Sequence, residues 1–363
     1  MAGSSFGNNF TVTTWGESHG KALGAVIDGC PAGIPLSEKD IQVFLDRRKP
    51  GQSDLSTQRN ETDQCEILSG TFEGLTTGTP ISVIVYNKDQ RSKDYTDISQ
   101  AFRPGHADYT YFEKYGIRDY RGGGRSSGRE TLGRVMAGAV ASKILSSIGV
   151  TSICYSKSVG PVEVSAYDED AIFKNPVYMP DMEAAKKAEE YIRECKENKE
   201  SVGGVVECRI KGLPVGIGEP VFEKTEALLA QAVMSIGAVK GFEIGDGFLA
   251  SEKKGSENND SFYMDGRKVR KSTNHSGGVL GGITDGDEIV FRAAIKPTPS
   301  ISLPQNTVTS DGAEVEMVVC GRHDPVIVPR AVVVVESMAL ITLTDLLFSD
   351  MSSRISKVEK LYV

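Results

Sequence analysis

Three of the four histidines occupy short segments rich in glycine and arginine. His19 lies in Gly-Glu-Ser-His-Gly, His106 in Arg-Pro-Gly-His-Ala-Asp, and His323 in Gly-Arg-His-Asp-Pro. A nearby glycine lets a ligand approach the backbone, and a nearby arginine or carboxylate can set the charge of the imidazole. A structural role is the alternative, but loop histidines of this kind contribute little to packing. The pattern therefore indicates an enzyme with acid–base chemistry.

Arginine is concentrated in one part of the chain. Ten of the eighteen arginines lie between residues 47 and 134, under a quarter of the sequence. That window holds ten arginines and four lysines against twelve acidic residues, whereas the whole chain carries a net charge of −8. Because the planar guanidinium matches carboxylate and phosphate groups in a bidentate way, the excess predicts a compact polyanionic ligand. A solvated charged surface is the alternative, and lysine-rich helices are more typical of it.

A glycine-rich segment, Arg-Gly-Gly-Gly-Arg-Ser-Ser-Gly-Arg-Glu-Thr, spans residues 121–131 and precedes a predicted helix. Free backbone amides and serine hydroxyls at a helix N-terminus suit a bound anion. The segment is not a P-loop, because the Gly-Lys-Ser/Thr ending and the preceding apolar strand are both absent. A flexible surface loop is the alternative.

Two later segments also suit a ligand. Lys-Pro-Thr-Pro-Ser at residues 296–300 follows a predicted strand and offers one cation with hydroxyls for a second phosphate. Residues 274–282, Asn-His-Ser-Gly-Gly-Val-Leu-Gly-Gly, offer bare backbone against which a flat ring could lie, although glycine-rich turns between strands look the same. His275 in this segment is as consistent with a loop residue that only forms hydrogen bonds as with a functional residue. The two anion-binding segments, at residues 121–131 and 296–300, predict that the protein binds one cofactor and one substrate.

Together, the motifs at residues 16–20, 103–108, 121–131 and 321–325 resemble those of the chorismate synthase family, in order and over essentially the full length. The resemblance implies an α+β fold, a β-α-β sandwich of antiparallel sheets flanked by helices, and a homotetramer. It further implies a lyase that uses reduced FMN. The implied reaction is the trans-1,4-elimination of phosphate from 5-enolpyruvylshikimate 3-phosphate, which gives chorismate.

The resemblance also implies roles for individual residues. His19 would protonate the departing phosphate, His106 would keep the reduced flavin protonated, and Asp324 would lie near flavin N5 and relay the proton taken from the substrate. The implied substrate-binding residues are Ser18, Arg48 and Arg129. The implied FMN-binding residues are Arg125, Ser126, Ser127, Gly237, Ala238, Gly281, Lys296, Pro297, Thr298, Pro299, Ser300 and Arg322. His323 would position its neighbours, and no metal ligand is expected.

The sequence departs from the family pattern in two places. Gly237-Ala238 stands where many bacterial members have Asn-Ala, which removes a side-chain contact to the flavin. Asp54 stands where some members have a second arginine, and Arg59 is a candidate substitute for the lost anion contact.

Two other classes of protein compete with this interpretation. A nucleotide-binding transferase would need a P-loop lysine and a pair of metal-binding carboxylates, and neither is evident. An anion- or RNA-binding module would not need three glycine-embedded histidines and would show aromatic residues among its basic ones. The acidic net charge further argues against nucleic acid as a partner. The compact length favours an external flavin reductase over an activity of the chain itself.

The elements that must position these residues are mixed. Helices are predicted at residues 37–48, 129–148, 184–196, 225–236 and 331–348, and strands at 80–86, 202–210, 288–295 and 315–319. Their irregular order favours α+β over a doubly wound sheet. Ser37 with Asp40 forms a helix start, which places Arg47 and Arg48 at the helix C-terminus, where cations are favoured. Residues 251–275 are predicted to be a mobile loop, and residues 1–363 a single domain.

Composition sets the remaining expectations. The 39% apolar content suffices for a substantial core, no run of apolar residues reaches membrane-span length, and residues 1–9 lack the layout of a signal peptide. We therefore expect a soluble cytoplasmic protein that does not bind membranes. The six cysteines show no paired spacing, which predicts reduced thiols rather than disulfides or a metal site.

Overall fold

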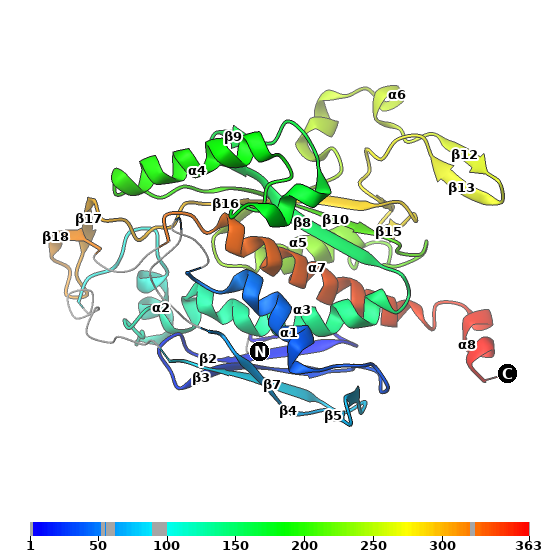
Figure 1. Cartoon of the computed structure of the whole chain (residues 1–363), viewed down its shortest axis with the longest axis horizontal. Coiled ribbons are helices and arrows are strands. Elements are labelled where there is room, and N and C mark those ends of the chain that lie inside the picture. Colours follow the sequence, from blue (N-terminus) through cyan, green and yellow to red (C-terminus); the bar gives the residue numbers. More distant parts are fainter. Residues whose placement is uncertain (1–2, 52–54, 56–61, 89–99, 320–323, 363) are drawn as a thin grey trace.

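Two antiparallel five-stranded sheets enclose a layer of helices in the computed structural model, which describes residues 3–51, 55, 62–88, 100–319 and 324–362 (Figure 1). The first sheet has the order β1 (Ser5–Phe6), β2 (Thr11–Gly16), β3 (Ala22–Asp28), β7 (Ile81–Tyr86), β4 (Cys65–Ser69). The second has the order β11 (Val239–Ile244), β16 (Ile289–Ile295), β10 (Gly204–Lys211), β8 (Thr151–Val159), β9 (Val162–Glu163). The expected α+β sandwich is confirmed, and its main helices lie between the sheets.

The helical layer centres on α3 (Thr131–Ser146) and α7 (Val328–Asp350), which pack against each other, with α1 (Glu38–Arg48) and α5 (Thr225–Met234) beside them. α3 contacts β3, and α7 contacts β8 and β10, so apolar side chains cover both helices on most sides. α7 is long and apolar enough to cross a membrane, but 83% of its most apolar window is buried inside the protein. It is therefore the central helix of the core.

The predicted helix start at Ser37 is confirmed. The backbone N–H of Ser37 donates to the Asp40 carboxylate over 2.8 Å, and its hydroxyl donates to the same oxygen over 2.7 Å. Because this pair fixes the first turn, the last turn carries Arg47 and Arg48 inward, and the Arg48 side chain is only 2% exposed. α1 thus delivers a cation to the interior.

The other predicted elements are confirmed within a few residues, as α3, α4 (Met182–Glu197), α5, α7, β7, β10, β16 and β18 (Glu314–Val318). The remaining helices of the described residues are α2 (Asp108–Tyr115), α6 (Gly255–Asn258) and α8 (Ile355–Tyr362), with 3-10 turns η2 (Gly124–Ser126), η3 (Gly128–Glu130), η4 (Glu169–Lys174) and η5 (Gly247–Glu252). Small hairpins join β5 (Thr71–Phe72) to β6 (Leu75–Thr76), β12 (Phe262–Asp265) to β13 (Lys268–Lys271), β14 (Val279–Leu280) to β15 (Ile283–Thr284), and β17 (Pro304–Val308) to β18.

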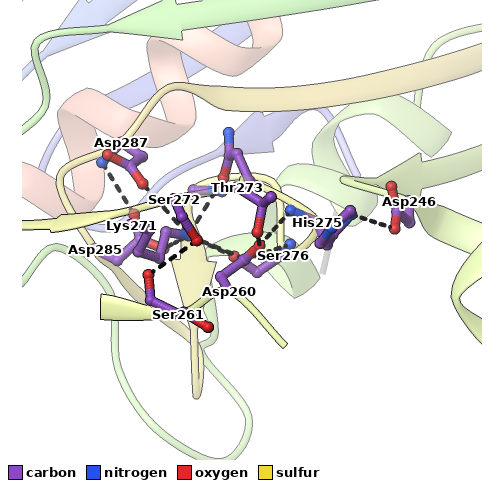
Figure 2. A network of polar contacts seen from close by, with 12 residues as sticks. Asp246, Asp260, Ser261, Lys271, Ser272, Thr273, His275, Ser276, Asp285 and Asp287 are labelled. Carbon is purple, nitrogen blue, oxygen red and sulfur yellow. Dashed lines mark hydrogen bonds and ion pairs between the residues drawn. The ribbon is translucent and has the colours of Figure 1, made fainter. Parts of the chain in front are cut away.

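Residues 251–275, predicted to be a mobile loop, carry regular secondary structure instead. The segment forms the end of η5, then α6 and the β12–β13 hairpin, and Figure 2 shows Lys271 at the base of that hairpin among carboxylates. The Lys271 ammonium lies 2.6 Å from Asp285 and 3.3 Å from Asp260, and its side chain is only 2% exposed. The polar composition that indicated solvation instead supplies partners for a buried ionic network, which we call the hairpin network (Asp260, Lys271, Asp285 and Asp287).

The prediction of reduced cysteines is wrong for one pair. Cys154 of β8 and Cys208 of β10 are register partners in the second sheet and form a disulfide. They are 54 residues apart, so only the strand register brings them together. Cys30, Cys65 and Cys195 are free and buried, and burial raises the pKa of the Cys30 and Cys65 thiols to about 11, which makes them poor nucleophiles. Cys320 lies outside the described residues.

Candidate active site

Two consecutive glycines, Gly122 and Gly123, allow the imidazoles of His19 and His106 to pack against the same loop. A Cβ on Gly122 would lie 2.3 Å from Cε1 of His19, and a Cβ on Gly123 would lie 3.0 Å from Cε1 of His106. Both glycines also have positive φ, at 73° and 84°, which other residues rarely adopt. The glycine-rich segment and the two histidine motifs, predicted separately, therefore form one site.

His106 is backed by a buried ion pair. Its Nδ1 lies 3.1 Å from Oδ1 of Asp108 and 3.1 Å from Nη2 of Arg103. Arg103 holds Asp108 in a bidentate pair, with contacts of 2.7 and 2.8 Å. Burial alone would raise the pKa of Asp108, but the hydrogen bonds from Arg103 and His106 outweigh it and hold that pKa well below the usual range. Asp108 is therefore a fixed anion at the imidazole.

The turn that carries His19 follows β2 and is held from two sides. Ser18 is fully buried; its hydroxyl lies 3.2 Å from Nδ1 of His19 and donates to the Gly122 carbonyl over 3.2 Å. Asn87, which follows β7, donates to the carbonyl of Gly20 over 2.8 Å. The imidazole of His19 is thus oriented by buried polar contacts rather than left on a free loop.

One carboxylate joins the two arginines that were predicted to bind substrate. Oδ2 of Asp63 lies 2.7 Å from Nη2 of Arg48, and Oδ1 lies 2.9 Å from Nη1 of Arg129. Nε of Arg129 also donates to Asn87 over 2.6 Å. Burial lowers the pKa of Arg48 to about 10, and the two arginines hold the pKa of Asp63 below its usual value although burial acts to raise it. We call Arg48, Asp63 and Arg129 the arginine corner. No motif in the sequence pointed to Asp63.

Asp324 adjoins this corner through α7. It forms an ion pair with Arg330, and Nε of Arg330 donates to the backbone carbonyl of Arg48 over 3.0 Å. The next residue, Pro325, accepts a hydrogen bond of 2.8 Å from the N–H of Val202. The carboxylate predicted to relay a proton is therefore linked to the arginine corner on one side and to the chain entering β10 on the other.

The segment at residues 296–300 reaches the His106 turn. Nζ of Lys296 donates to the Gly105 carbonyl over 2.6 Å, and its backbone N–H donates to Ala238 over 2.9 Å. The Thr298 carbonyl accepts a hydrogen bond of 2.6 Å from Ser201, next to Val202. Burial, with the charge of Lys240 second, lowers the pKa of Lys296. The predicted segments at 237–238 and 296–300 thus meet beside His106.

These contacts close on themselves. We call the closed set the site ring; it consists of Ser18, His19, Gly122, Gly123, Gly105, His106, Lys296, Thr298, Asp324, Arg330, the arginine corner and Asn87, with Arg103, Asp108 and Arg118 behind His106. Among these described residues, six cationic side chains face three carboxylates, a surplus of three positive charges. The arrangement is typical of an enzyme, and its surplus of positive charge beside two imidazoles suits a polyanionic ligand.

Three further predicted residues flank the ring. The guanidinium of Arg125 donates to the Thr14 hydroxyl over 2.7 Å and lines a cavity of about 110 Å³ together with Ser235. Ser126 donates to the Gly123 carbonyl over 2.7 Å, and the Ser127 hydroxyl accepts from the N–H of Arg129 over 3.3 Å. Arg125 and Ser235 therefore border the same cavity.

Other predicted residues are not brought to the ring. Gly281 lies in the turn between β14 and β15, and the neighbouring backbone of Gly282 and Thr284 bonds to Thr225 and Ile217 rather than to a residue of the ring. His275 pairs instead with Asp246 at 2.8 Å and Lys253 at 3.1 Å, a loop role (Figure 2). Asp54, Arg59, Arg322 and His323 lie outside the described residues.

Comparison with known proteins names the family. Residues 10–348 match the family model of chorismate synthase. The chorismate synthases of Agathobacter rectalis and Lachnospira eligens are 61% and 60% identical to this chain, over 100% of it and over 99% and 100% of their own lengths. A crystal structure of chorismate synthase superposes with a TM-score of 0.76 at 32% identity, covering 98% of this chain and 96% of that one. The chain belongs to the chorismate synthase family and is a carbon–oxygen lyase, which confirms the resemblance seen in the motifs.

Proposed function

We propose that this chain converts 5-enolpyruvylshikimate 3-phosphate to chorismate by trans-1,4-elimination of phosphate, with reduced FMN as cofactor. The observation that carries the proposal is the site ring, which gathers two histidines, three carboxylates and a surplus of positive charge from segments far apart in sequence. The substrate has two carboxylates and one phosphate, so its charge complements the surplus of three positive charges. Ser18, Arg48 and Arg129 would bind it.

The residues present fit a flavin mononucleotide. The close approach of Gly122 and Gly123 to the two imidazoles places these beside the 125–127 segment, and a cation with hydroxyls at residues 296–300 suits the phosphate. The Thr298 hydroxyl is buried and finds no hydrogen-bond partner among the described residues, as a ligand-binding group would. The residues proposed to hold the cofactor are Arg125, Ser126, Ser127, Gly237, Ala238, Lys296 to Ser300 and, outside the described part, Arg322. When bound, reduced flavin supplies an electron transiently to assist departure of the phosphate.

The side chains of the chain would manage the protons. His19, oriented by Ser18, donates a proton to the departing phosphate. Asp108, 3.1 Å from Nδ1 of His106, fixes the orientation of the imidazole, which suits a group that holds a proton at the flavin. Asp324, fixed by Arg330, takes up the proton that leaves the substrate. Each role matches the position of its residue in the ring.

We further propose a single-domain cytoplasmic protein that assembles as a homotetramer and receives reduced flavin from an external reductase. One large cluster of buried apolar residues, which runs from Phe10 to Leu343 and includes both sheets, supports the single domain. The burial of α7 supports a soluble protein. The homotetramer rests on the family resemblance, and the external reductase is the alternative that the assay below tests.

An anaerobic assay tests the function. Chemically reduced FMN should support release of phosphate from 5-enolpyruvylshikimate 3-phosphate, and oxidised FMN should support none. Equal rates with the two forms would contradict the proposed cofactor role. The same assay with oxidised FMN and NADPH alone separates the two sources of reducing equivalents, because turnover there would require a reductase activity in this chain.

A further inference from the structure

We propose that Asp63 is a positioning residue of this enzyme: its carboxylate holds Arg48 and Arg129 side by side so that the two guanidiniums bind the anionic groups of one substrate molecule. This inference rests on the proposed function only in taking these two arginines as substrate-binding. Asp63 itself need not touch the substrate.

The geometry of the arginine corner supports a bridging role. Each oxygen of Asp63 serves a different arginine, at 2.7 Å for Arg48 and 2.9 Å for Arg129, and the Asp63 side chain is 0% exposed. The backbone of Asp63 has φ of 45°, a left-handed conformation that Asp tolerates better than most residues. The carboxylate is therefore held in one place by the backbone on one side and by two cations on the other.

Other contacts set the orientation of each guanidinium. Nε of Arg129 donates to Asn87, and the same Asn87 donates to the carbonyl of Gly20 in the His19 turn. Nη1 of Arg48 lies 3.5 Å from the Gly128 carbonyl in the glycine-rich segment. Asp63 thus connects two arginines that are each tied to a different part of the site ring, and a shift of its carboxylate would move both.

The charge of the corner is not that of a purely structural ion pair. One carboxylate faces two buried guanidiniums, so one positive charge is uncompensated within the corner. Burial of an unbalanced charge is costly unless an anion is taken up. Nε of Arg48 is also buried without a hydrogen-bond partner among the described residues. Asp63 reduces the repulsion between the arginines and leaves enough positive charge to attract a substrate anion.

Two explanations of Asp63 predict opposite results for Asp63→Asn. If the carboxylate only lowers the positive charge of the site, its removal should tighten anion binding. If it positions the arginines, its removal should weaken binding, because an amide oxygen can accept from one guanidinium while the amide N–H groups face the other. The sign of the change in affinity therefore decides between them.

The experiment is calorimetric titration of the full chain with 5-enolpyruvylshikimate 3-phosphate, with steady-state kinetics beside it. We expect Asp63→Asn to raise Kd by about 10- to 100-fold, the loss of one to two tenfold steps that a charged hydrogen bond represents, and to raise KM more than it lowers kcat. In an Arg48→Met background, the same substitution should have a much smaller effect, since one of the two guanidiniums it positions is already gone.

The matched control is Asp345→Asn. Asp345 is also a buried acid, but it accepts hydrogen bonds from the backbone of Asn8, Asn9 and Phe10, at the far end of β2 from His19. This variant should lose stability without a change in Kd. A Kd for Asp63→Asn equal to or below that of the wild type would overturn the inference.

A second variant covers the case in which Asp63→Asn does not fold. Asp63→Glu keeps the charge and moves the carboxylate by one methylene, so weaker binding in this variant supports positioning and unchanged binding overturns it. Failure of the proposed function is distinguishable, because it would appear as a wild-type chain that releases no phosphate under any flavin condition, whatever the ranking of the variants in direct binding.

Discussion

The site ring and the hairpin network are both buried ionic networks, but their residues are spread differently along the sequence. The four residues of the hairpin network fall between Asp260 and Asp287, at the base of the β12–β13 hairpin and in the turn between β15 and β16 (Figure 2). The site ring joins residues from Ser18 to Arg330, which lie on segments that follow strands of both sheets and on helices between them. A local network can anchor one segment, whereas a network of this span forms only when the whole fold does.

The two networks also differ in how their surplus charge is satisfied. In the hairpin network, carboxylates outnumber Lys271, but Asp260 accepts hydrogen bonds from Thr273 at 2.7 Å and from the N–H groups of His275 and Ser276 at 2.8 and 3.0 Å. In the site ring, cations are in surplus, and buried donors on Arg48 and Thr298 lack partners among the described residues. Surplus charge that the protein satisfies itself stabilises the fold, whereas surplus charge left unsatisfied indicates a ligand.

The largest expected effect falls in the site ring. His19→Ala should bind reduced FMN and substrate but slow phosphate release by roughly two to four orders of magnitude, the usual scale for loss of a general acid. His106→Ala should in addition change the absorbance spectrum of the bound reduced flavin, because Asp108 and Arg103 would lose the imidazole that they orient. Anaerobic spectra and single-turnover rates of both variants measure this.

Those spectra can also contradict the assignment of roles. If His19→Ala shifts the reduced-flavin spectrum and His106→Ala does not, the two histidines have exchanged roles. If neither variant loses activity, the ring is not a site of acid–base chemistry. The site ring and the hairpin network would then differ in structure but not in function.

The hairpin network should respond in stability rather than in rate. Lys271→Met leaves the buried carboxylates of Asp260 and Asp285 without their cation, which should cost about 3 kcal/mol or more. Phosphate release should stay within about twofold of the wild type, since the network has no described contact with the site ring. Urea unfolding and hydrogen exchange over residues 262–271 measure the loss. Unchanged exchange there would mean that Lys271 does not anchor the hairpin.

Alanine substitutions at two glycines test the geometry of the ring, with a smaller expected effect on rate. Gly122→Ala places a methyl group 2.3 Å from Cε1 of His19 and should lower kcat by at least about tenfold, because small displacements of a catalytic group are costly. Gly128→Ala in the same segment is the control, as a Cβ there meets no atom within 4 Å. Kinetics of the two variants decide; equal activities would show that the loop need not approach His19 so closely.

Local signals in the sequence predicted much of the helical layer and part of the site. Ser37 with Asp40 gave the start of α1 and placed Arg48 at its end, and the glycine, serine and histidine motifs gave residues that the structure brings together. These features depend on neighbours a few residues apart, for which capping and turn chemistry are informative.

The rest depends on contacts that no local pattern records. Asp63 is 66 residues from Arg129, and Cys154 pairs with Cys208 only through the register of β8 and β10. The segment at 251–275 looked like a solvated loop because its charges were counted singly, whereas in the fold they neutralise one another. Strands β2 and β3, which support the turn that carries His19, were not predicted either.

The smallest expected effect is the pH dependence of the hairpin network. Burial would raise the pKa of Asp260, but hydrogen bonds from Thr273, Ser276 and His275 together hold it well below the usual value near 3.9. A carboxyl whose pKa is depressed by folding contributes stability above its unfolded pKa, and that contribution is lost as the pH falls from about 4 toward the folded pKa. In Asp260→Asn this loss is absent, so the fall in unfolding free energy below pH 4 should be shallower than in the wild type by up to about 1.4 kcal/mol per pH unit. Asp265→Asn at the exposed end of the same hairpin, where the side chain is 67% exposed, should keep the wild-type slope. Urea midpoints from pH 6 to pH 3 give the slopes of the wild type and the two variants. A wild-type slope in Asp260→Asn would mean that the hairpin network does not satisfy its own surplus charge, and the contrast with the site ring would fail.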